Sequence, residues 1–153
     1  LFETPPSDAS IRERNGWSKE DTIFLLVSTS HKRKGLDTLI EVFEELPNNY
    51  KLLVAGTSFK SSNPQIVSLG FVKDMGTIYH QVDVLLHPAV YEPFGQIITE
   101  AFAAKVPVII SDRVGAKEFV NSSRGLVIDS LAPAVWYEAI LKFDKEKNID
   151  KHR

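Results

Sequence analysis

Two glutamates, Glu92 and Glu100, lie eight positions apart in one segment of the chain. Pro93 and Gly95, between them, predict a tight turn and a helix that begins beside Gly95. The first N–H groups of a helix, here those of residues 94–97, have no partner inside it, and the helix dipole favours negative charge at that end. We therefore expect an anionic group such as a diphosphate at this turn. The two carboxylates could then hold the uncharged, hydroxyl-rich parts of the same ligand.

A run of three cations, Lys32, Arg33 and Lys34, directly precedes a stretch with helical spacing. Together with the hydroxyl groups of residues 28–30, these cations could reach a phosphate group, and a charge-assisted contact of this kind contributes roughly 1.5–3 kcal/mol. The alternative is a solvated surface loop, which is what most charge runs are. This run follows the carboxyl end of a predicted strand, where ligands bind, so phosphate binding and a surface loop are about equally favoured.

The glutamates and one histidine also have plainer interpretations. Glu100 could be a surface glutamate of a helix, and Glu92 a charge that favours the helix dipole. His87, at the end of a predicted strand, could contact a sugar or could equally be a core or capping histidine. The remaining histidines have no ligand spacing and there is no Asp-x-Asp pair, so we predict no metal site.

The composition is that of an ordinary globular domain. The 153 residues are enough for one core, and a formal net charge of −2 offers no general attraction for nucleic acid or an anionic membrane. The absence of cysteine excludes disulfides, thiolate catalysis and cysteine-based zinc sites, and fits a reducing compartment such as the cytoplasm. No G-x-x-x-x-G-K-[ST], G-x-G-x-x-G or G-x-S-x-G motif occurs, which disfavours nucleoside triphosphate, dinucleotide and serine-hydrolase sites.

Short Val-, Ile- and Leu-rich runs alternate with segments of helical period, which predicts an α/β fold with a Rossmann-like, doubly wound parallel sheet. We expect strands at residues 22–27, 51–55, 66–72, 82–88, 107–110 and 126–128. We expect helices at residues 36–46 and 75–81, directly after Gly95, near residues 117–120 and from Pro133 onward. The last helix should bury its apolar residues, which are Val135, Trp136, Ala139, Ile140 and Phe143.

Three turns that are polar or contain glycine follow strands of this predicted sheet, at residues 28–35, 87–95 and 111–115. The carboxyl ends of parallel strands meet at one edge, and open α/β sheets bind their ligands beyond that edge. We therefore expect these three turns to form one site.

Several of these segments, taken together, resemble the E-x7-E signature of the retaining GT-B glycosyltransferases, and specifically of glycosyltransferase family 4 (group 1). The resemblance extends from about Thr22 to Ile140. The segments that carry it are Glu92-Pro93-Phe94-Gly95 through Glu100-Ala101, Lys34-Gly35, Gly70-Phe71-Val72, Asp83-Val84-Leu85-Leu86-His87-Pro88, Pro107-Val108, Gly115 with Glu118, and Gly125.

The resemblance implies that the chain is one half of a GT-B enzyme, its donor-binding Rossmann-like domain. It places that domain at residues 21–143, a linker or extension at residues 1–20 and a polar tail at residues 144–153. The N-terminal acceptor-binding domain is then absent from this chain. A nucleotide sugar, UDP- or GDP-linked, would lie between the two domains with no metal and no other cofactor. Membrane contact is expected only through the other half, as peripheral attachment at the inner face.

The resemblance also implies roles for single residues. Glu92 would hold the donor sugar as a stabiliser, and Glu100 would bind the ribose hydroxyls of the nucleotide. Lys34, together with Arg33, would neutralise the diphosphate leaving group. The remaining donor contacts would come from Phe94, Gly95, Gln96, Ile97, Val72, His87 and Thr29. Family members usually have Gly-Arg after the first strand, where this chain has Ser28-Thr29, so Arg33 is a candidate substitute for that arginine.

Two other functions stay open at this point. A catalytically silent nucleotide-sugar-binding or scaffold domain would have the same fold. A sugar-nucleotide epimerase shares the architecture but needs a different acid–base set, and the E-x7-E segment disfavours it. For a transferase, synthesis of a cell-envelope polysaccharide or lipopolysaccharide is the expected pathway.

Overall fold

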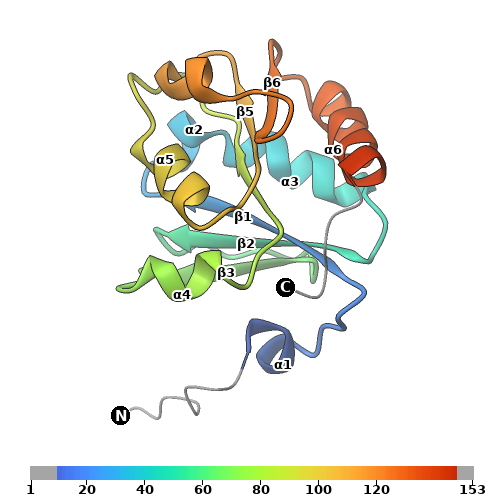
Figure 1. Ribbon diagram of the computed structural model, residues 1–153. Helices are drawn as coiled ribbons and strands as arrows, with labels where there is room; N and C mark the ends of the chain where they lie inside the picture. Colours follow the sequence, from blue (N-terminus) through green and yellow to red (C-terminus); the bar gives the residue numbers. More distant parts are fainter. Residues whose placement is uncertain (1–9, 148–153) are drawn as a thin grey trace.

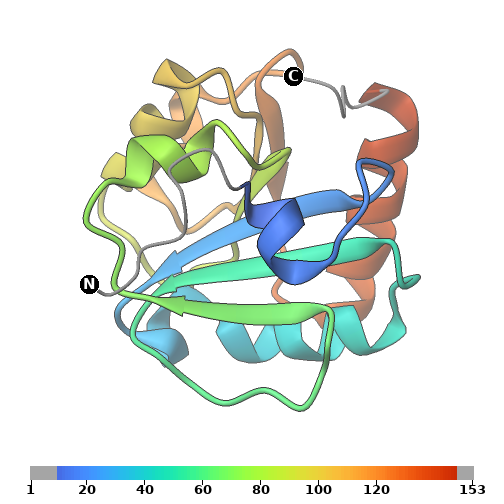
Figure 2. The same ribbon diagram turned by 90° about the horizontal axis from the view of Figure 1, so that it is seen from below.

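A computed structural model describes residues 10–147 of the chain, with side chains to residue 144. Its centre is one parallel sheet of six strands in the order β3-β2-β1-β4-β5-β6, with helices on both faces (Figures 1 and 2). The predicted α/β, Rossmann-like doubly wound sheet is therefore confirmed. The strands are β1 (Thr22–Ser28), β2 (Tyr50–Gly56), β3 (Ile66–Gly70), β4 (Val84–His87), β5 (Val108–Ser111) and β6 (Gly125–Ile128).

The helical elements occupy most of the expected places. They are α1 (Ile11–Asn15), α2 (His31–Lys34), α3 (Leu36–Glu45), α4 (Met75–Tyr79), α5 (Gln96–Ala103), η1 (Gly115–Phe119) and α6 (Pro133–Lys147). The cation run predicted to be a polar turn is instead the short helix α2. Its four residues close one turn, in which the N–H of Lys34 donates to the carbonyl oxygen of Ser30 at 2.9 Å.

Two apolar layers enclose the sheet. On one face α3 and α6 pack over β1, β2 and β4, with Phe24, Phe43 and Trp136 almost wholly buried among them. Burying a side chain of this size contributes roughly 1.5–3 kcal/mol, so this layer is a main source of stability. The other face is covered by α1, α4, α5 and η1. Both faces of β1, β2, β4 and β5 are thus covered, which explains their continuous apolar runs, whereas the edge strands β3 and β6 are only partly buried.

The prediction that α6 buries Val135 is wrong, because this side chain is 42% exposed. Trp136, Ile140 and Phe143 are buried as predicted, and Ala139 is half-buried against the same core. These residues follow each other at helical spacing, and Val135 lies outside the stripe that they form.

The connection from β2 to β3 has no helix, as the polar composition of residues 57–64 predicts. Side chains at its two ends take the place of a helix. Phe59 packs against the core layer below α3, and Gln65 Nε2 donates to the carbonyl oxygens of Pro47 at 2.9 Å and Tyr50 at 2.8 Å. The loop therefore closes this edge without a further layer.

Helix α1 lies inside the segment assigned as a linker and packs on the domain. Its Ile11 is buried, the N–H of Ile11 donates to Gln81 Oε1 at 2.7 Å, and Arg12 approaches Asp83 at 3.4 Å. At the other end, α6 continues past the predicted end at residue 143 to Lys147. Residues 1–9 of the linker and residues 148–153 of the tail lie outside the described residues. Within the described part of the chain, none of the helices has the length and apolarity that a membrane crossing requires.

Gly35, between α2 and α3, brings the chain against the loop that follows β4. Its φ of 84° is left-handed, and a Cβ built on it would overlap the carbonyl group of Pro88. Only glycine allows this approach, and the approach sets α2 beside the residues after β4.

We expect Gly35→Ala to destabilise the protein far more than Gly16→Ala does. Both glycines have a positive φ, but a Cβ on Gly16 would meet nothing within 4 Å. Gly16→Ala should therefore cost only the left-handed strain of roughly 1–2 kcal/mol, while Gly35→Ala adds an overlap with backbone. Urea denaturation of both variants measures the difference. Equal losses would show that Gly35 is not held against Pro88.

Candidate functional site

The candidate site lies where β1 and β4 are neighbours, because the strand order reverses its direction between them. The segments after three strands meet at the carboxyl edge there. The N–H of Val90 donates to the carbonyl oxygen of Arg33 at 2.8 Å, which ties the loop after β4 to α2. The N–H of Glu92 donates to the carbonyl oxygen of Arg113 at 3.1 Å, and the N–H of Gly115 donates to that of Glu92 at 2.9 Å. The three turns predicted to form one site are therefore joined through their backbones.

The carboxylate of Glu92 binds two cations from α2. Its Oε1 accepts a short hydrogen bond from Lys34 Nζ and lies 3.3 Å from Nη1 of Arg33. Arg33 also donates to the carbonyl oxygen of Tyr91 at 3.0 Å, so its guanidinium is fixed twice to the same loop. The side chains of Lys34 and Glu92 are 13% and 16% exposed, whereas that of Arg33 is 42% exposed. The three residues proposed as catalytic thus form one ion-pair cluster, half-shielded from solvent.

This cluster changes the acidity of Glu92. Partial burial alone raises the pKa of its carboxyl group, but the hydrogen bond and charge of Lys34, with His87 and Arg33, lower it by more. The net pKa of Glu92 is below its ordinary value, so the carboxylate is charged at neutral pH.

His87, the last residue of β4, lies behind Glu92 and has no solvent exposure. Its Nε2 is 3.6 Å from Oε1 of Glu92, and neither ring nitrogen has a hydrogen-bond partner among the described residues. Burial, reinforced by the charge of Lys34, lowers the pKa of His87 to about 4 against the opposing effect of Glu92. The imidazole is therefore neutral at physiological pH. Contact of His87 with a sugar stays a prediction, since its side chain is not exposed in this structure.

Helix α5 begins directly after these residues, at a glycine whose φ is 90°. The N-cap residue Gly95 makes no side-chain cap, and the N–H of Ile98 donates to the carbonyl oxygen of Gly95 at 2.9 Å. Binding of an anion by the N–H groups of residues 94–97 stays a prediction. The approach of η1 fixes the turn, because a Cβ on Gly115 would overlap the carbonyl group of Pro93. Phe94 is 46% exposed and packs edge-on against Phe119, with ring centroids 6.2 Å apart.

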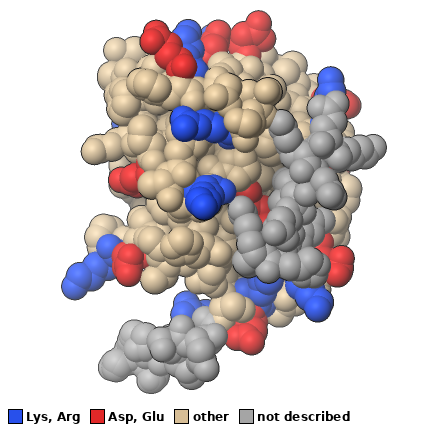
Figure 3. Space-filling view, viewed as in Figure 1, with Lys and Arg blue, Asp and Glu red and all other residues tan. Residues whose placement is uncertain are grey.

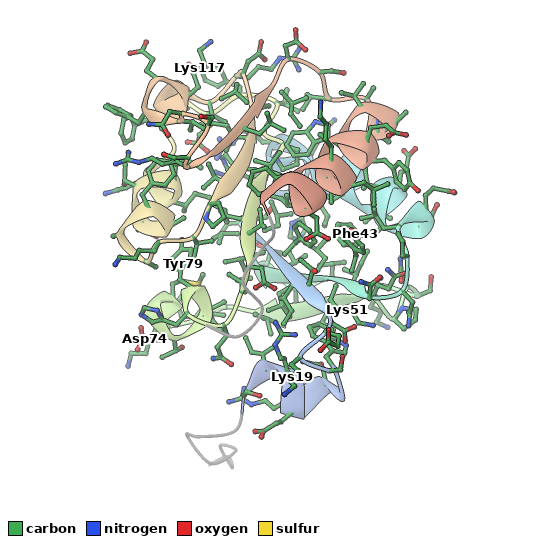
Figure 4. The ribbon with its side chains drawn as sticks, turned by 45° about the vertical axis from the view of Figure 1, so that its right-hand side comes forward. Lys19, Phe43, Lys51, Asp74, Tyr79 and Lys117 are labelled. Carbon is green, nitrogen blue, oxygen red and sulfur yellow. The ribbon has the colours of Figure 1, made fainter. Side chains whose placement is uncertain are left out.

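Glu100 has a partner that sequence reasoning missed. The hydroxyl of Tyr79, on α4, donates to Oε1 of Glu100 at 3.1 Å (Figure 4 shows Tyr79 between α4 and α5). Burial, followed by the charge and hydrogen bond of Glu100, raises the pKa of Tyr79 well above its usual value, so the phenol keeps its proton. The sequence contained no signal for this pair, since Tyr79 simply fits the apolar stripe of a helix. No hydrogen bond or ion pair joins Glu100 to Glu92 within residues 10–144.

The other predicted donor contacts differ in their accessibility. Gln96 and Thr29 are exposed, and the carbonyl oxygen of Thr29 accepts from Thr57 Oγ1 at 3.1 Å. Ile97 and Val72 are half-buried and pack against the core layer that α4 and α5 cover. Their role as donor contacts stays a prediction.

The charges outside the cluster are dispersed. On the face shown in Figure 3, basic and acidic side chains are scattered among uncharged ones and neither sign forms one continuous patch. Among the described residues, no group of three His, Asp or Glu side chains could hold a metal ion.

Comparison with known proteins identifies a family that this chain matches. The profile described as "Glycosyl transferases group 1" matches residues 7–153. The lipopolysaccharide glucosyltransferase WaaG of Escherichia coli (strain K12) is 27% identical over 81% of this chain and 37% of its own length. The capsular polysaccharide biosynthesis glycosyltransferase CapM of Staphylococcus aureus is 32% identical over 64% of this chain and 30% of its own length.

Solved structures share the fold. The crystal structure of WaaG, a glycosyltransferase involved in lipopolysaccharide biosynthesis, superposes with a TM-score of 0.80 at 23% identity, covering 95% of this chain and 44% of that one. Anabaena Alr3699/HepE in complex with UDP-glucose gives a TM-score of 0.77 at 22% identity, with the same two coverages of 95% and 44%. The chain spans about a third of the length of the curated relatives it matches.

The neutral, buried state of His87 predicts a pH dependence of stability. When the chain is unfolded, this histidine binds a proton below its ordinary pKa of 6.5, and when folded it binds one only near pH 4. The unfolded state therefore holds more protons in this window, so the free energy of unfolding falls as the pH falls, by up to about 1.4 kcal/mol per pH unit. His87→Leu removes this term.

We therefore expect His87→Leu to gain stability relative to the wild type as the pH is lowered from 7 to 5, in urea denaturation at each pH. His80→Gln, at an exposed position, controls for the loss of any histidine. A constant difference between His87→Leu and the wild type would contradict the buried neutral imidazole.

Proposed function

The chain belongs to the family of group 1 glycosyl transferases, and from this membership we propose that it is the donor-binding domain of a retaining glycosyltransferase. Its donor is a nucleoside diphosphate sugar. The observation that supports this most directly is the cluster of Lys34, Arg33 and Glu92 beside the uncapped start of α5. It combines positive charge and free N–H groups for a diphosphate with a carboxylate for a sugar.

The diphosphate is the group that must be stabilised as the reaction proceeds. The bond between the anomeric carbon and the phosphate oxygen breaks, and the nucleoside diphosphate leaves with the electron pair. Lys34 and Arg33 neutralise this growing negative charge, together with the N–H groups at the start of α5. The acceptor oxygen then bonds to the anomeric carbon on the face that the leaving group vacates, and the hydroxyl proton passes to an oxygen of the departing diphosphate. Attack on this face retains the configuration.

Glu92 serves the sugar in this scheme. Its carboxylate accepts hydrogen bonds from the sugar hydroxyls, and its charge stabilises the cationic character of the anomeric carbon in the transition state. It acts as a stabiliser and forms no covalent bond to the sugar. Glu100 binds the ribose hydroxyls, with its orientation fixed by Tyr79. The backbone near Val72 borders the base.

The donor and acceptor classes follow from the relatives. The Alr3699/HepE structure contains UDP-glucose, which favours a UDP-linked donor, with GDP as the alternative. WaaG and CapM are named for lipopolysaccharide and capsular polysaccharide, which favours an acceptor of the cell envelope. We propose that a second domain of the same protein binds this acceptor. The enzyme would work in the cytoplasm and contact the inner face of the membrane through that domain.

Calorimetric titration with UDP, GDP and ADP, with and without EDTA, tests donor binding. We expect one of the three to bind without metal, and Lys34→Ala to weaken binding roughly ten- to a hundred-fold because a charge-assisted contact is lost. Glu100→Ala should weaken it through the ribose.

Lys32→Ala is the matched control for Lys34→Ala. Lys32 belongs to the same short helix and carries the same charge but is exposed. Its loss should therefore change affinity by less than about three-fold. Equal losses of nucleotide affinity in Lys32→Ala and Lys34→Ala would show that Lys34 acts only through general charge attraction and not through a specific contact. Failure of all three nucleotides to bind the full-length protein would favour a scaffold domain that binds no nucleotide.

Glu92→Gln should raise the affinity for the nucleoside diphosphate while it lowers sugar transfer. In the empty site the Glu92 carboxylate contacts both Lys34 and Arg33 and offsets one of their two charges, so a diphosphate competes with it for the same cations. Removal of its charge frees them, and a gain of about 1 kcal/mol corresponds to roughly five-fold tighter binding. The same titrations measure it, and weaker binding by this variant would show that Glu92 does not compete.

A further inference from the structure

His87 is a buried polar group outside any hydrogen bond of the described residues. The ring is fully buried at the end of β4, and within residues 10–144 neither Nδ1 nor Nε2 has a hydrogen-bond partner. Other buried polar side chains at the same edge are satisfied, since Ser111 Oγ donates to the carbonyl oxygen of Ala89 at 2.6 Å and Ser28 Oγ lies 2.7 Å from His31 Nδ1. A buried polar group without a partner costs about 1–3 kcal/mol, and an apolar side chain of the same size would avoid that cost. Stability alone therefore gives no reason for a histidine here.

The nearest charged groups show what the ring could serve. Its Nε2 is 3.6 Å from Oε1 of Glu92, which is too long for a hydrogen bond. The same oxygen is already bound by Lys34 and approached by Arg33. His87 is thus the third donor around one carboxylate oxygen, and in the empty site the other two occupy it.

The two cations are held differently. Arg33 has a second acceptor, the carbonyl oxygen of Tyr91 at 3.0 Å. Lys34 Nζ has one hydrogen-bond partner within residues 10–144, and this is Glu92. A diphosphate that attracts Lys34 therefore removes the strongest contact of the Glu92 carboxylate. Because that carboxylate is 16% exposed, water replaces the contact only in part, and the group needs another donor.

We propose that His87 is a positioning residue, to which the Glu92 carboxylate passes from Lys34 when a nucleoside diphosphate binds. The Nε2–H group donates to Oε1 after a movement of less than 1 Å, and Glu92 stays directed at the donor sugar. This inference rests on the proposed function. A neutral imidazole suits the role, since it offers one N–H donor and adds no positive charge that would hold Glu92 against the incoming sugar.

A double-mutant cycle on the full-length protein, titrated with UDP and GDP, tests the transfer of the carboxylate. In the wild-type background His87→Leu should weaken nucleotide binding about five-fold, because Glu92 then releases Lys34 without receiving another donor. In the Glu92→Gln background His87→Leu should have no effect. His87→Gln, whose amide can donate from nearly the same place, should bind within two-fold of the wild type.

Two further measurements separate positioning from packing. His87→Leu should unfold at the wild-type temperature or above at pH 7, since it removes no hydrogen bond. In NMR spectra of the imidazole groups, saturating UDP or GDP should shift the Nε2 proton of His87 downfield, whereas His31, which already has two partners, serves as the reference.

Equal weakening by His87→Leu in both backgrounds, or a His87 signal unchanged in the nucleotide-bound protein, would overturn the inference and leave the donor-binding function intact. Absence of binding by the wild type would overturn both. A five-fold effect that needs the Glu92 carboxylate and is restored by His87→Gln would support the proposed role.

Discussion

The ion pair between Lys34 and Glu92 is the interaction on which the arrangement of this site depends. It joins the helix after β1 to the loop after β4, two segments that the strand order brings together although they lie far apart in sequence. Backbone bonds between Val90 and Arg33, and between Glu92 and the loop after β5, reinforce the same junction. These contacts between α2 and the loop after β4 keep the Glu92 carboxylate within reach of Lys34 and Arg33, and all three side chains stay partly exposed.

Glycine makes the junction possible. Gly35 approaches the carbonyl group of Pro88, and Gly115 approaches that of Pro93, at places where any side chain would overlap backbone. The loops after β1, β4 and β5 are thereby packed backbone against backbone. The start of α5, whose N-cap residue Gly95 makes no side-chain cap, follows directly after the loop that carries Glu92.

The charges of the empty site are compensated in part. Glu92 offsets one of the two positive charges of Lys34 and Arg33, so the cluster keeps one net positive charge before a ligand arrives. For a domain proposed to bind a diphosphate, this arrangement limits affinity for phosphate alone and favours ligands that also give Glu92 something to bind, such as sugar hydroxyls. The same contacts of Glu92 that stabilise the empty domain therefore also favour binding of the complete donor over phosphate alone.

Local sequence determined most of the fold. The continuous apolar run of residues 22–27 indicates a buried strand, and the helical spacing of Trp136, Ile140 and Phe143 indicates a helix. Both patterns can be read from neighbouring residues along the chain. The same holds for the place of the site, since the carboxyl ends of parallel strands share one edge. Val135 was misjudged because one turn of helix can bury only part of its apolar residues.

Tertiary structure alone decided the pairs. The sequence indicated Glu92, Lys34 and Arg33 as site residues, but not that one oxygen of Glu92 receives both cations across the junction. It did not indicate the contact between Tyr79 and Glu100. It also did not indicate that His87 is buried beside Glu92 with no hydrogen-bond partner in the described part of the chain. Such contacts depend on the distance between segments that are remote in sequence, and that distance is set by how the helices and loops pack on the sheet.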